Sequence, residues 1–234
     1  LAEHGAIWSA IYHHLIPLDV VFSFCLPIVS SFLERLSSSY CSELGFKTLP
    51  QEGDFFTAPI LEFFTKLETT DRFLTWEQAL HYSGLSYELF VQLIAQSLCI
   101  AIFLSQSFEE IGLELWDGKI EWAQNKTQDS SELILVDSIG PDELRLLDPK
   151  NKTQVSKEFL RMFYRNTPWF EMVKEAKANH GSNWKKVVQK QTASPPQLSP
   201  SFRLIADKLY PSLALALTKE NPGNQGLELN LLLK

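Results

Sequence analysis

Residues 113–148 read LELWDGKIEWAQNKTQDSSELILVDSIGPDELRLLD, and the chain is organised around this polar hairpin. In the first arm Asp117, Lys119 and Glu121 occupy alternate positions, so on a strand the three charged side chains share one face. The second arm, Leu133 to Val136, is an apolar run that stops at Asp137. We therefore predict two adjacent strands whose ends bring charged groups together.

Two interpretations of these charges are open. Carboxylates at neighbouring strand ends, with Arg145 nearby, suit a divalent cation and an anionic ligand, because Mg²⁺ takes carboxylate oxygens and commonly shares them with phosphates. The alternative is a half-buried hairpin whose solvent-facing side is merely charged. The pattern alone favours this second interpretation, because such hairpins are common.

The composition is that of a globular protein. Hydrophobic residues make up 45% and charged residues 21% of the 234 residues, so the chain can bury a core without disulfides or metals. The net charge of -7 argues against binding to nucleic-acid phosphates, which requires a basic face. Cys25, Cys41 and Cys99 are odd in number and have no paired spacing, and no signal peptide is recognisable, so we expect a cytoplasmic protein.

Two apolar stretches raise the question of a membrane span, which needs about 20 apolar residues. The first, residues 16–33, contains Pro17, Asp19 and Pro27, and we predict a buried strand followed by a helix. The second, residues 86–110, is apolar over much of its circumference, and we predict a long buried helix. No membrane association is therefore expected.

The remaining elements follow from apolar spacing and from capping residues. Helices are expected over residues 1–14, 75–84, 156–164, 167–178 and 201–218, and a strand over residues 59–66. Thr75 and Gln78 have the spacing of a capping box. Residues 46–58 are expected to form a loop or domain junction, residues 179–200 a surface excursion, and residues 221–234 an apolar tail with no clear partner.

Three segments resemble the SAICAR synthetase family (phosphoribosylaminoimidazole-succinocarboxamide synthase). They are IGLELWDGKIEWA (111–123), ELILVDSIGPDELRLLD (132–148) and SKEFLRMFYR (156–165). The family carries a Leu-x-Asp-x-Lys-x-Glu strand, a strand that ends in Asp-Glu, a Pro-Asp-Ser-x-Arg turn and an Asp-Lys-x-Phe-x-Arg helix start. PILEFFTK (59–66), SSYCSELG (38–45) and residues 195–220 are also similar to family segments, so the resemblance extends from about Ile16 to Lys219.

The resemblance implies an α+β, two-lobed fold related to kinases and ATP-grasp enzymes, with the N-terminal ATP lobe incomplete. Residues 1–56 would be a remnant of that lobe, residues 57–180 the C-terminal catalytic domain, and residues 181–234 a Pro-rich loop, closing helix and apolar tail. It also implies a cytoplasmic ligase of de novo purine biosynthesis, which uses ATP and Mg²⁺ to join L-aspartate to carboxyaminoimidazole ribotide through acyl-phosphate chemistry. These small molecules are the expected partners, and a homo-oligomer is left open.

The family's site residues transfer to matching positions of this chain. Glu121 and Asp137 would hold Mg²⁺ and so the ATP phosphates, in agreement with the charge pattern. Asp117 and Lys119 would be catalytic, because a lysine can offset charge on a transferred phosphate. The implied substrate-binding residues are Arg145 for the ribotide phosphate, Ser39, Asp71, and the site-closing Lys157 and Arg161.

The chain departs from the family pattern at several positions. Ser138, Glu143 and Ser156 stand where an acidic residue, a serine and an aspartate are expected, and Thr70-Asp71-Arg72 replaces His-Asp-Pro. The family's opening segment, with its Gly-containing nucleotide lid and lysines, has no recognisable counterpart, so the chain would be either a fragment of the enzyme or a divergent member.

Two other hypotheses stay open. One is a catalytically impaired pseudoenzyme that binds a nucleotide or the ribotide on the same scaffold. The other is a helical interaction protein that uses residues 86–110 and the apolar tail instead of the hairpin.

Overall fold

The computed structural model describes residues 13–26, 32, 35, 41, 44, 46–68, 70–126, 130–191 and 194–233. The chain divides into two compact units, Leu1–Leu146 and Leu147–Lys234, and each is described by itself. Strands and helices are both present, so the expected α+β class is confirmed. The lobes expected at residues 1–56, 57–180 and 181–234 stay a prediction.

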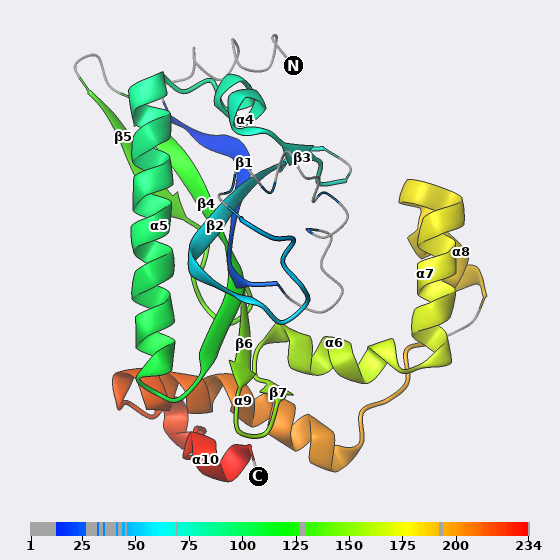
Figure 1. Cartoon of the computed structure of the whole chain (residues 1–234). Helices are drawn as coiled ribbons and strands as arrows, with labels where there is room; N and C mark the ends of the chain where they lie inside the picture. The colour runs from blue at the N-terminus through cyan, green and yellow to red at the C-terminus, as the bar shows by residue number, and fades with distance from the viewer. Residues whose placement is uncertain are drawn as a thin grey trace. The chain divides into compact units, whose positions relative to one another are not determined.

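The first unit is built on a sheet with the neighbour order β3-β2-β1-β4-β6, while β5 pairs with a different stretch of β4 (Figure 1). Its strands are β1 (His13–Cys25), β2 (Phe55–Thr65), β3 (Phe73–Leu74), β4 (Glu114–Lys126), β5 (Ser131–Val136) and β6 (Leu144–Asp148). The pairs of β1 with β2 and β4, of β2 with β3, and of β4 with β5 are antiparallel. The boundary between the two units falls within β6.

Most of the expected strands are present, with corrections at their ends. The two arms of the hairpin are β4 and β5, and the strand expected over residues 59–66 is part of β2. The loop or domain junction expected over residues 46–58 ends earlier than predicted, because β2 already begins at Phe55. The helix expected over residues 1–14 is wrong for His13 and His14, which belong to β1, and otherwise lies outside the described residues.

Two helices of the first unit begin at the capping residues that the sequence marks. In α4 (Trp76–Ser83) the Gln78 N–H donates to Thr75 Oγ1 at 3.2 Å and the Thr75 N–H donates to Gln78 Oε1 at 3.0 Å, so the capping box is confirmed. Gly84 ends α4 in the left-handed region with φ 72°. The Ser86 side chain caps α5 (Tyr87–Glu109), which is the expected long helix.

The long helix α5 lies along one face of the sheet (Figure 1). Its Phe90 ring packs 5.2 Å from Phe63 of β2, and its Ser97 hydroxyl accepts a 3.0 Å hydrogen bond from Trp122 Nε1 of β4. The opposite side of α5 exposes apolar residues that include Phe103. Among the described helices α5 is the one with the length and hydropathy for a membrane crossing, a test that core helices also pass.

The second unit is mainly helical. It contains β7 (Thr153–Gln154), α6 (Lys157–Arg165), α7 (Pro168–His180), α8 (Trp184–Lys190), α9 (Pro200–Thr218) and α10 (Leu229–Leu232). β7 pairs with the last residues of β6. Pro168 stands at the start of α7, where the missing N–H costs no helical hydrogen bond, so the helix is not broken there. Ser156 stands at the N-cap of α6 but makes no side-chain cap bond.

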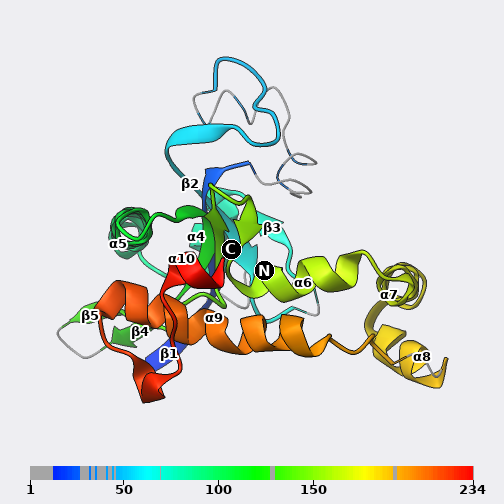
Figure 2. The same cartoon turned by 90° about the horizontal axis from the view of Figure 1, so that it is seen from below.

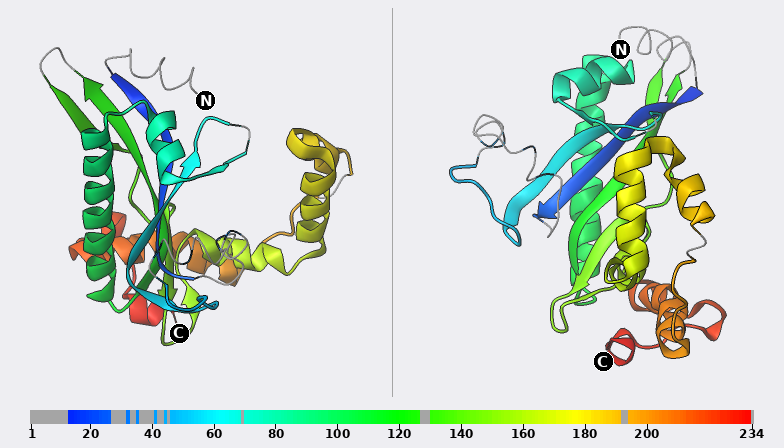
Figure 3. Two further views of the ribbon diagram at one scale, coloured as in Figure 1. Left: turned by 45° about the horizontal axis from the view of Figure 1, so that its top comes forward. Right: turned by 90° about the vertical axis from the view of Figure 1, so that its right-hand side faces the viewer.

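Aromatic and apolar contacts hold the second unit together. α6 and α9 lie side by side (Figure 2), and Phe159 of α6 stacks on Phe202 of α9 with ring centroids 4.6 Å apart. α7 and α8 form a helical hairpin around Val173, Ala176 and Val188 (Figure 3). Within the surface excursion expected over residues 179–200, residues 184–190 form α8, whose apolar side chains help to close this small core.

The C-terminal tail does have a partner within its unit. The Leu227 N–H donates to Ser212 Oγ of α9 at 2.9 Å, and the Asn151 side chain donates to the Leu233 carbonyl oxygen at 2.8 Å. The tail is thereby anchored at two points along its length.

Candidate functional site

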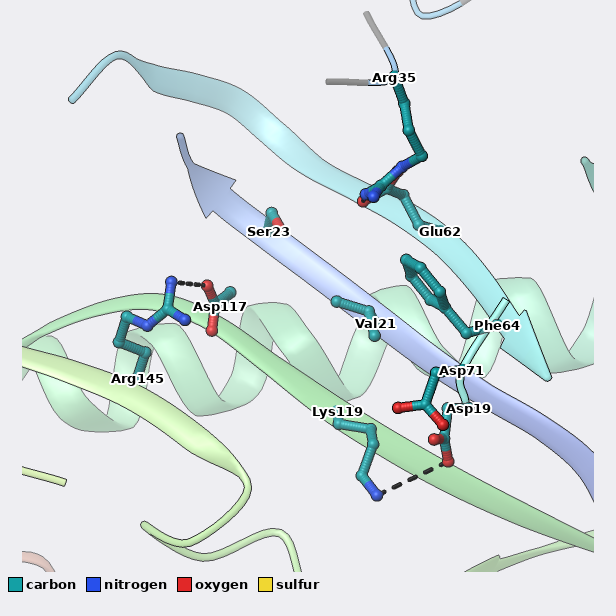
Figure 4. A pocket seen from close by; sticks show the side chains of 10 residues that line it. All are labelled: Asp19, Val21, Ser23, Arg35, Glu62, Phe64, Asp71, Asp117, Lys119 and Arg145. Atoms are coloured by element: carbon teal, nitrogen blue, oxygen red, sulfur yellow. Dashed lines mark hydrogen bonds and ion pairs between the residues drawn. The ribbon is translucent and has the colours of Figure 1, made fainter. Parts of the chain in front are cut away.

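A polar cavity of about 380 Å³ lies on the face of the sheet opposite to α5 (Figure 4). Strand alternation creates it, because Phe63 and Trp122 point toward α5 while their neighbours along each strand point the other way. The lining residues are Asp19, Val21, Ser23, Arg35, Glu62, Phe64, Asp71, Asp117, Lys119 and Arg145. All of them belong to the first unit.

The strand register explains why distant residues meet in this cavity. Asp19 of β1 lies between Phe64 of β2 and Glu121 of β4, and Val21 lies between Glu62 and Lys119. Paired residues of an antiparallel sheet project to the same face, so three strands contribute charged side chains to one surface.

At one end of the site two lysines share one carboxylate. The Nζ atoms of Lys66 and Lys119 each lie 2.5 Å from Glu121 Oε1. The same two lysines lie 3.2 Å and 3.6 Å from Asp19 Oδ1. Lys119 is also 3.6 Å from Glu143 Oε2, so these five side chains form one partly buried ion network.

The network fixes the charge of Lys119. Burial alone would lower the pKa of this lysine, but its hydrogen bond to Glu121 and the charges of Asp19 and Glu143 outweigh burial and raise the pKa. Lys119 therefore remains a cation at neutral pH. It can stabilise negative charge on a ligand, whereas it is not suited to act as a general base.

Glu121 and Asp137 come together at the end of β5. Glu121 pairs with Val136, and Asp137 follows directly with a left-handed backbone at φ 67°. The Ser138 N–H lowers the pKa of Asp137 most strongly, and the neighbouring Glu121 side chain lowers this pKa further. The ammonium groups of Lys66 and Lys119 balance the Glu121 charge, and neighbouring carboxylate oxygens of this kind suit Mg²⁺.

Arg145 pairs with Asp117 at the other end of the cavity. Arg145 Nη1 donates to Asp117 Oδ2 at 2.8 Å (Figure 4). The Nε of Arg145 is buried and forms no hydrogen bond with the described residues. Because the guanidinium of Arg145 lines the cavity and only part of its donor set is used by Asp117, it is suited to bind an anionic group.

A third ion pair closes the cavity beside β2. Arg35 Nη2 lies 2.8 Å from both carboxylate oxygens of Glu62, and the guanidinium is 5.1 Å from the ring centres of Phe64 and Phe73. Burial raises the pKa of Glu62, against the lowering effect of Arg35. This pair forms a fixed wall of the cavity.

The structure brings together five of the predicted site residues. Lys119, Glu121 and Asp137 form or adjoin the ion network, and Asp117 and Arg145 pair within the cavity. Asp71 also lines the cavity.

The other predicted residues are not placed at this cavity. Ser39 lies outside the described residues. Lys157 and Arg161 stand on α6 in the second unit, where Arg161 donates to Glu158 at 2.8 Å. Their roles stay predictions.

Three residues of the site were missed in the sequence. Asp19, Glu62 and Lys66 come from β1 and from the end of β2. Alternation offered a signal, because Glu62, Phe64 and Lys66 must share a face on a strand. Asp19 within an apolar stretch was a second signal, since a buried carboxylate needs a partner.

Comparison with known proteins confirms the expected resemblance. A model of the SAICAR synthetase family matches residues 16–176. A putative phosphoribosylaminoimidazole-succinocarboxamide synthase of Archaeoglobus fulgidus is 34% identical over 198 residues, which cover 84% of this chain and 56% of that protein. The synthase of Thermoplasma acidophilum is 31% identical over 70% of this chain and 57% of that protein. The chain thus spans just over half the length of these relatives.

Solved structures show the same fold. A SAICAR synthase of Saccharomyces cerevisiae in complex with SAICAR is 19% identical, with a TM-score of 0.56 over 89% of this chain and 62% of that one. A SAICAR synthetase in complex with ADP is 23% identical, with a TM-score of 0.51 over 79% of this chain and 66% of that one.

Proposed function

The chain belongs to the SAICAR synthetase family, and we propose that its cavity serves the ligase reaction of that family in purine biosynthesis. In this reaction the carboxylate of carboxyaminoimidazole ribotide and the amino group of L-aspartate are joined as an amide, while ATP is cleaved to ADP and phosphate. The observation that carries the proposal is the contact between Glu121 and Asp137, held by lysines beside a cavity that contains Arg145.

The donor set fits the metal that the reaction requires. Glu121 and Asp137 supply neighbouring carboxylate oxygens, which Mg²⁺ prefers and commonly shares with phosphates. When bound, Mg²⁺ would neutralise charge on the ATP phosphates. The complexes of relatives with ADP and with SAICAR support the same ligand classes for this chain.

The chain's own residues would then divide the remaining work. Lys119, which stays protonated, would offset negative charge on the transferred phosphate. Asp117 would orient Arg145, whose guanidinium lines the cavity and would bind the ribotide phosphate. Asp71 lines the cavity and would contact the ribotide or the aspartate.

The larger assembly is part of the proposal. The two-lobed arrangement related to kinases and ATP-grasp enzymes, with residues 1–56 as part of an ATP lobe, would supply the remaining nucleotide contacts. Lys157 and Arg161 would close the site from α6. A cytoplasmic location agrees with the small-molecule substrates of this pathway.

A binding protein without turnover is the second candidate, and Glu143 favours it. Glu143 stands where the family pattern has a serine, and its carboxylate lies 3.6 Å from Lys119. An additional negative charge at that lysine weakens its ability to stabilise a transferred phosphate. The chain would then hold a nucleotide or the ribotide without joining the substrates.

An assay for ADP release distinguishes the two candidates. Purified protein is incubated with ATP, Mg²⁺, L-aspartate and carboxyaminoimidazole ribotide, and each component is omitted in turn. ADP that appears only with all components supports the ligase. Absence of ADP together with retained ribotide binding refutes the ligase and supports the binding protein. The Glu143→Ser variant is the matched comparison, and its rate is expected to exceed that of the unmodified chain if Glu143 impairs Lys119.

A further inference from the structure

Lys66 connects three strands at the Glu121 carboxylate. It directly follows β2, and its Nζ atom contacts Glu121 of β4 at 2.5 Å and Asp19 of β1 at 3.2 Å. Its backbone N–H donates to the Pro17 carbonyl oxygen at 3.2 Å. The lysine is therefore fixed at its backbone as well as at its side chain.

Lys119 contacts the same oxygen of Glu121 but differs in its surroundings. It stands on β4 two residues before Glu121, and its Nζ atom lies 3.6 Å from Asp19 Oδ1 of β1, farther than the 3.2 Å that separates Lys66 from the same oxygen. Lys119 lines the cavity and has 28% of its side chain exposed, whereas Lys66 is not among the lining residues and has 19% exposed. Lys119 therefore lines the ligand space, whereas Lys66 contacts Glu121 without lining it.

We propose that Lys66 is a positioning residue, which holds the Glu121 carboxylate in the orientation that binds a divalent cation together with Asp137. The inference rests on the proposed cation site. It assigns to Lys66 a role that neither the sequence motifs nor the family match assign, and it leaves the ligand-facing role to Lys119.

A positioning role and a purely electrostatic role of Lys66 predict opposite changes in cation affinity when the lysine is replaced. A positive charge close to a cation repels it, so removal of the Lys66 charge alone would strengthen cation binding. Loss of a group that orients a metal ligand instead weakens binding, commonly by about 10–100-fold. The sign of the change therefore separates the two roles.

The test is a titration of the chain with MnCl₂, followed by the water-proton relaxation rate. Lys66→Met is expected to weaken Mn²⁺ binding about tenfold or more, and Lys66→Arg, which retains a donor to both carboxylates, is expected to recover most of it. Lys119→Met is expected to bind Mn²⁺ as tightly as the unmodified chain or more tightly. Lys47→Met removes an exposed lysine of the same unit and is expected to change nothing.

The outcomes separate this inference from the proposed function. Unchanged or tighter Mn²⁺ binding by Lys66→Met overturns the positioning role while the cation site stands. Absence of Mn²⁺ binding by the unmodified chain overturns both, because it removes the site itself. Thermal melting followed by circular dichroism confirms folding of each variant. If Lys66→Met melts below the assay temperature, Lys66→Gln, which is neutral but polar, takes its place in the same comparison.

Discussion

Replacement of Gly118 by alanine is expected to destabilise the first unit by about 2 kcal/mol. Gly118 lies between Asp117 and Lys119 on β4, and its backbone packs against two residues with no exposed surface, Phe22 and Leu144. A Cβ atom added there would lie 2.5 Å from Leu144 Cδ2 and 2.8 Å from Phe22 Cε1, with Phe22 Cζ in still closer contact.

The magnitude follows from this overlap. Carbon atoms at ordinary contact are about 3.5–4 Å apart, so each neighbour must move by roughly 1 Å. Neither can move into solvent, because both are fully buried. Overpacking of this kind costs up to about 3 kcal/mol, and the lower entropy of alanine in the unfolded chain offsets about 0.5–1 kcal/mol of it.

Urea unfolding at 25 °C, followed by tryptophan fluorescence and circular dichroism, measures the effect. Gly140→Ala is the matched control, since an added Cβ meets no atom within 4 Å, and its stability is expected to change by no more than about 0.5 kcal/mol. A Gly118→Ala variant as stable as this control would refute the close packing of β1 and β6 against β4.

Three further predictions concern Arg35, the cysteines and Asp137. Arg35→Met leaves the buried Glu62 carboxylate without its partner and is expected to cost about 3 kcal/mol at pH 7 in urea unfolding. The cost should shrink toward pH 4, because protonation of Glu62, whose pKa is raised by burial, removes the unpaired charge. Peptide mapping after iodoacetamide treatment at pH 8 should show modified Cys99 and unmodified Cys25, since Cys99 is exposed and burial raises the pKa of the Cys25 thiol to about 12. Asp137→Gly should change stability by less than about 1 kcal/mol, because relief of the left-handed backbone offsets the entropy of glycine, yet weaken Mn²⁺ binding at least about tenfold.

Controls and contrary outcomes are specific to each of these changes. Arg72→Met, which breaks the exposed pair of Arg72 with Glu68, should cost much less stability than Arg35→Met, and an equal cost for the two variants would show that burial of the Arg35–Glu62 pair has no special effect. Rapid modification of Cys25 in the folded protein would show that β1 opens. Full Mn²⁺ affinity in Asp137→Gly would remove Asp137 from the cation site.

The hairpin was predictable because alternation is a property of the strand itself. Asp117, Lys119 and Glu121 share the face opposite to Trp122, as the spacing predicts. The capping box at Thr75 was predictable for a similar reason, since its hydrogen bonds join residues three positions apart. Local geometry of this kind can be read from the sequence alone.

The partners of the hairpin were not predictable. Asp19 faces Glu121, and Lys66 reaches the same carboxylate, only because the register of β1 with β2 and β4 brings them together. Register depends on long-range pairing, which a single sequence does not specify. The same pairing places His13 opposite Asn125. His13 and His14 therefore belong to a strand, although the apolar spacing of residues 1–14 is typical of a helix.

The family resemblance identified the charged face as a ligand site where pattern alone favoured a solvated hairpin. The structure then supplied geometric support, since Asp117, Lys119 and Arg145 line one cavity and Lys119 contacts Glu121. Ser39, Lys157 and Arg161 were transferred from the same resemblance, and their roles stay predictions.

The central claim is that Glu121 and Asp137 bind the cation that holds the phosphates. Nucleotide binding measured with and without Mg²⁺ tests this claim most directly. Isothermal titration of the chain with ADP is carried out in Mg²⁺ and in EDTA, and repeated with Glu121→Gln. We expect ADP affinity to depend on Mg²⁺ in the unmodified chain and to lose that dependence in the variant, because the amide side chain keeps the shape but not the charge of the Glu121 carboxylate. An equal dependence on Mg²⁺ in both proteins would contradict the claim and return the hairpin to a merely solvated charged surface.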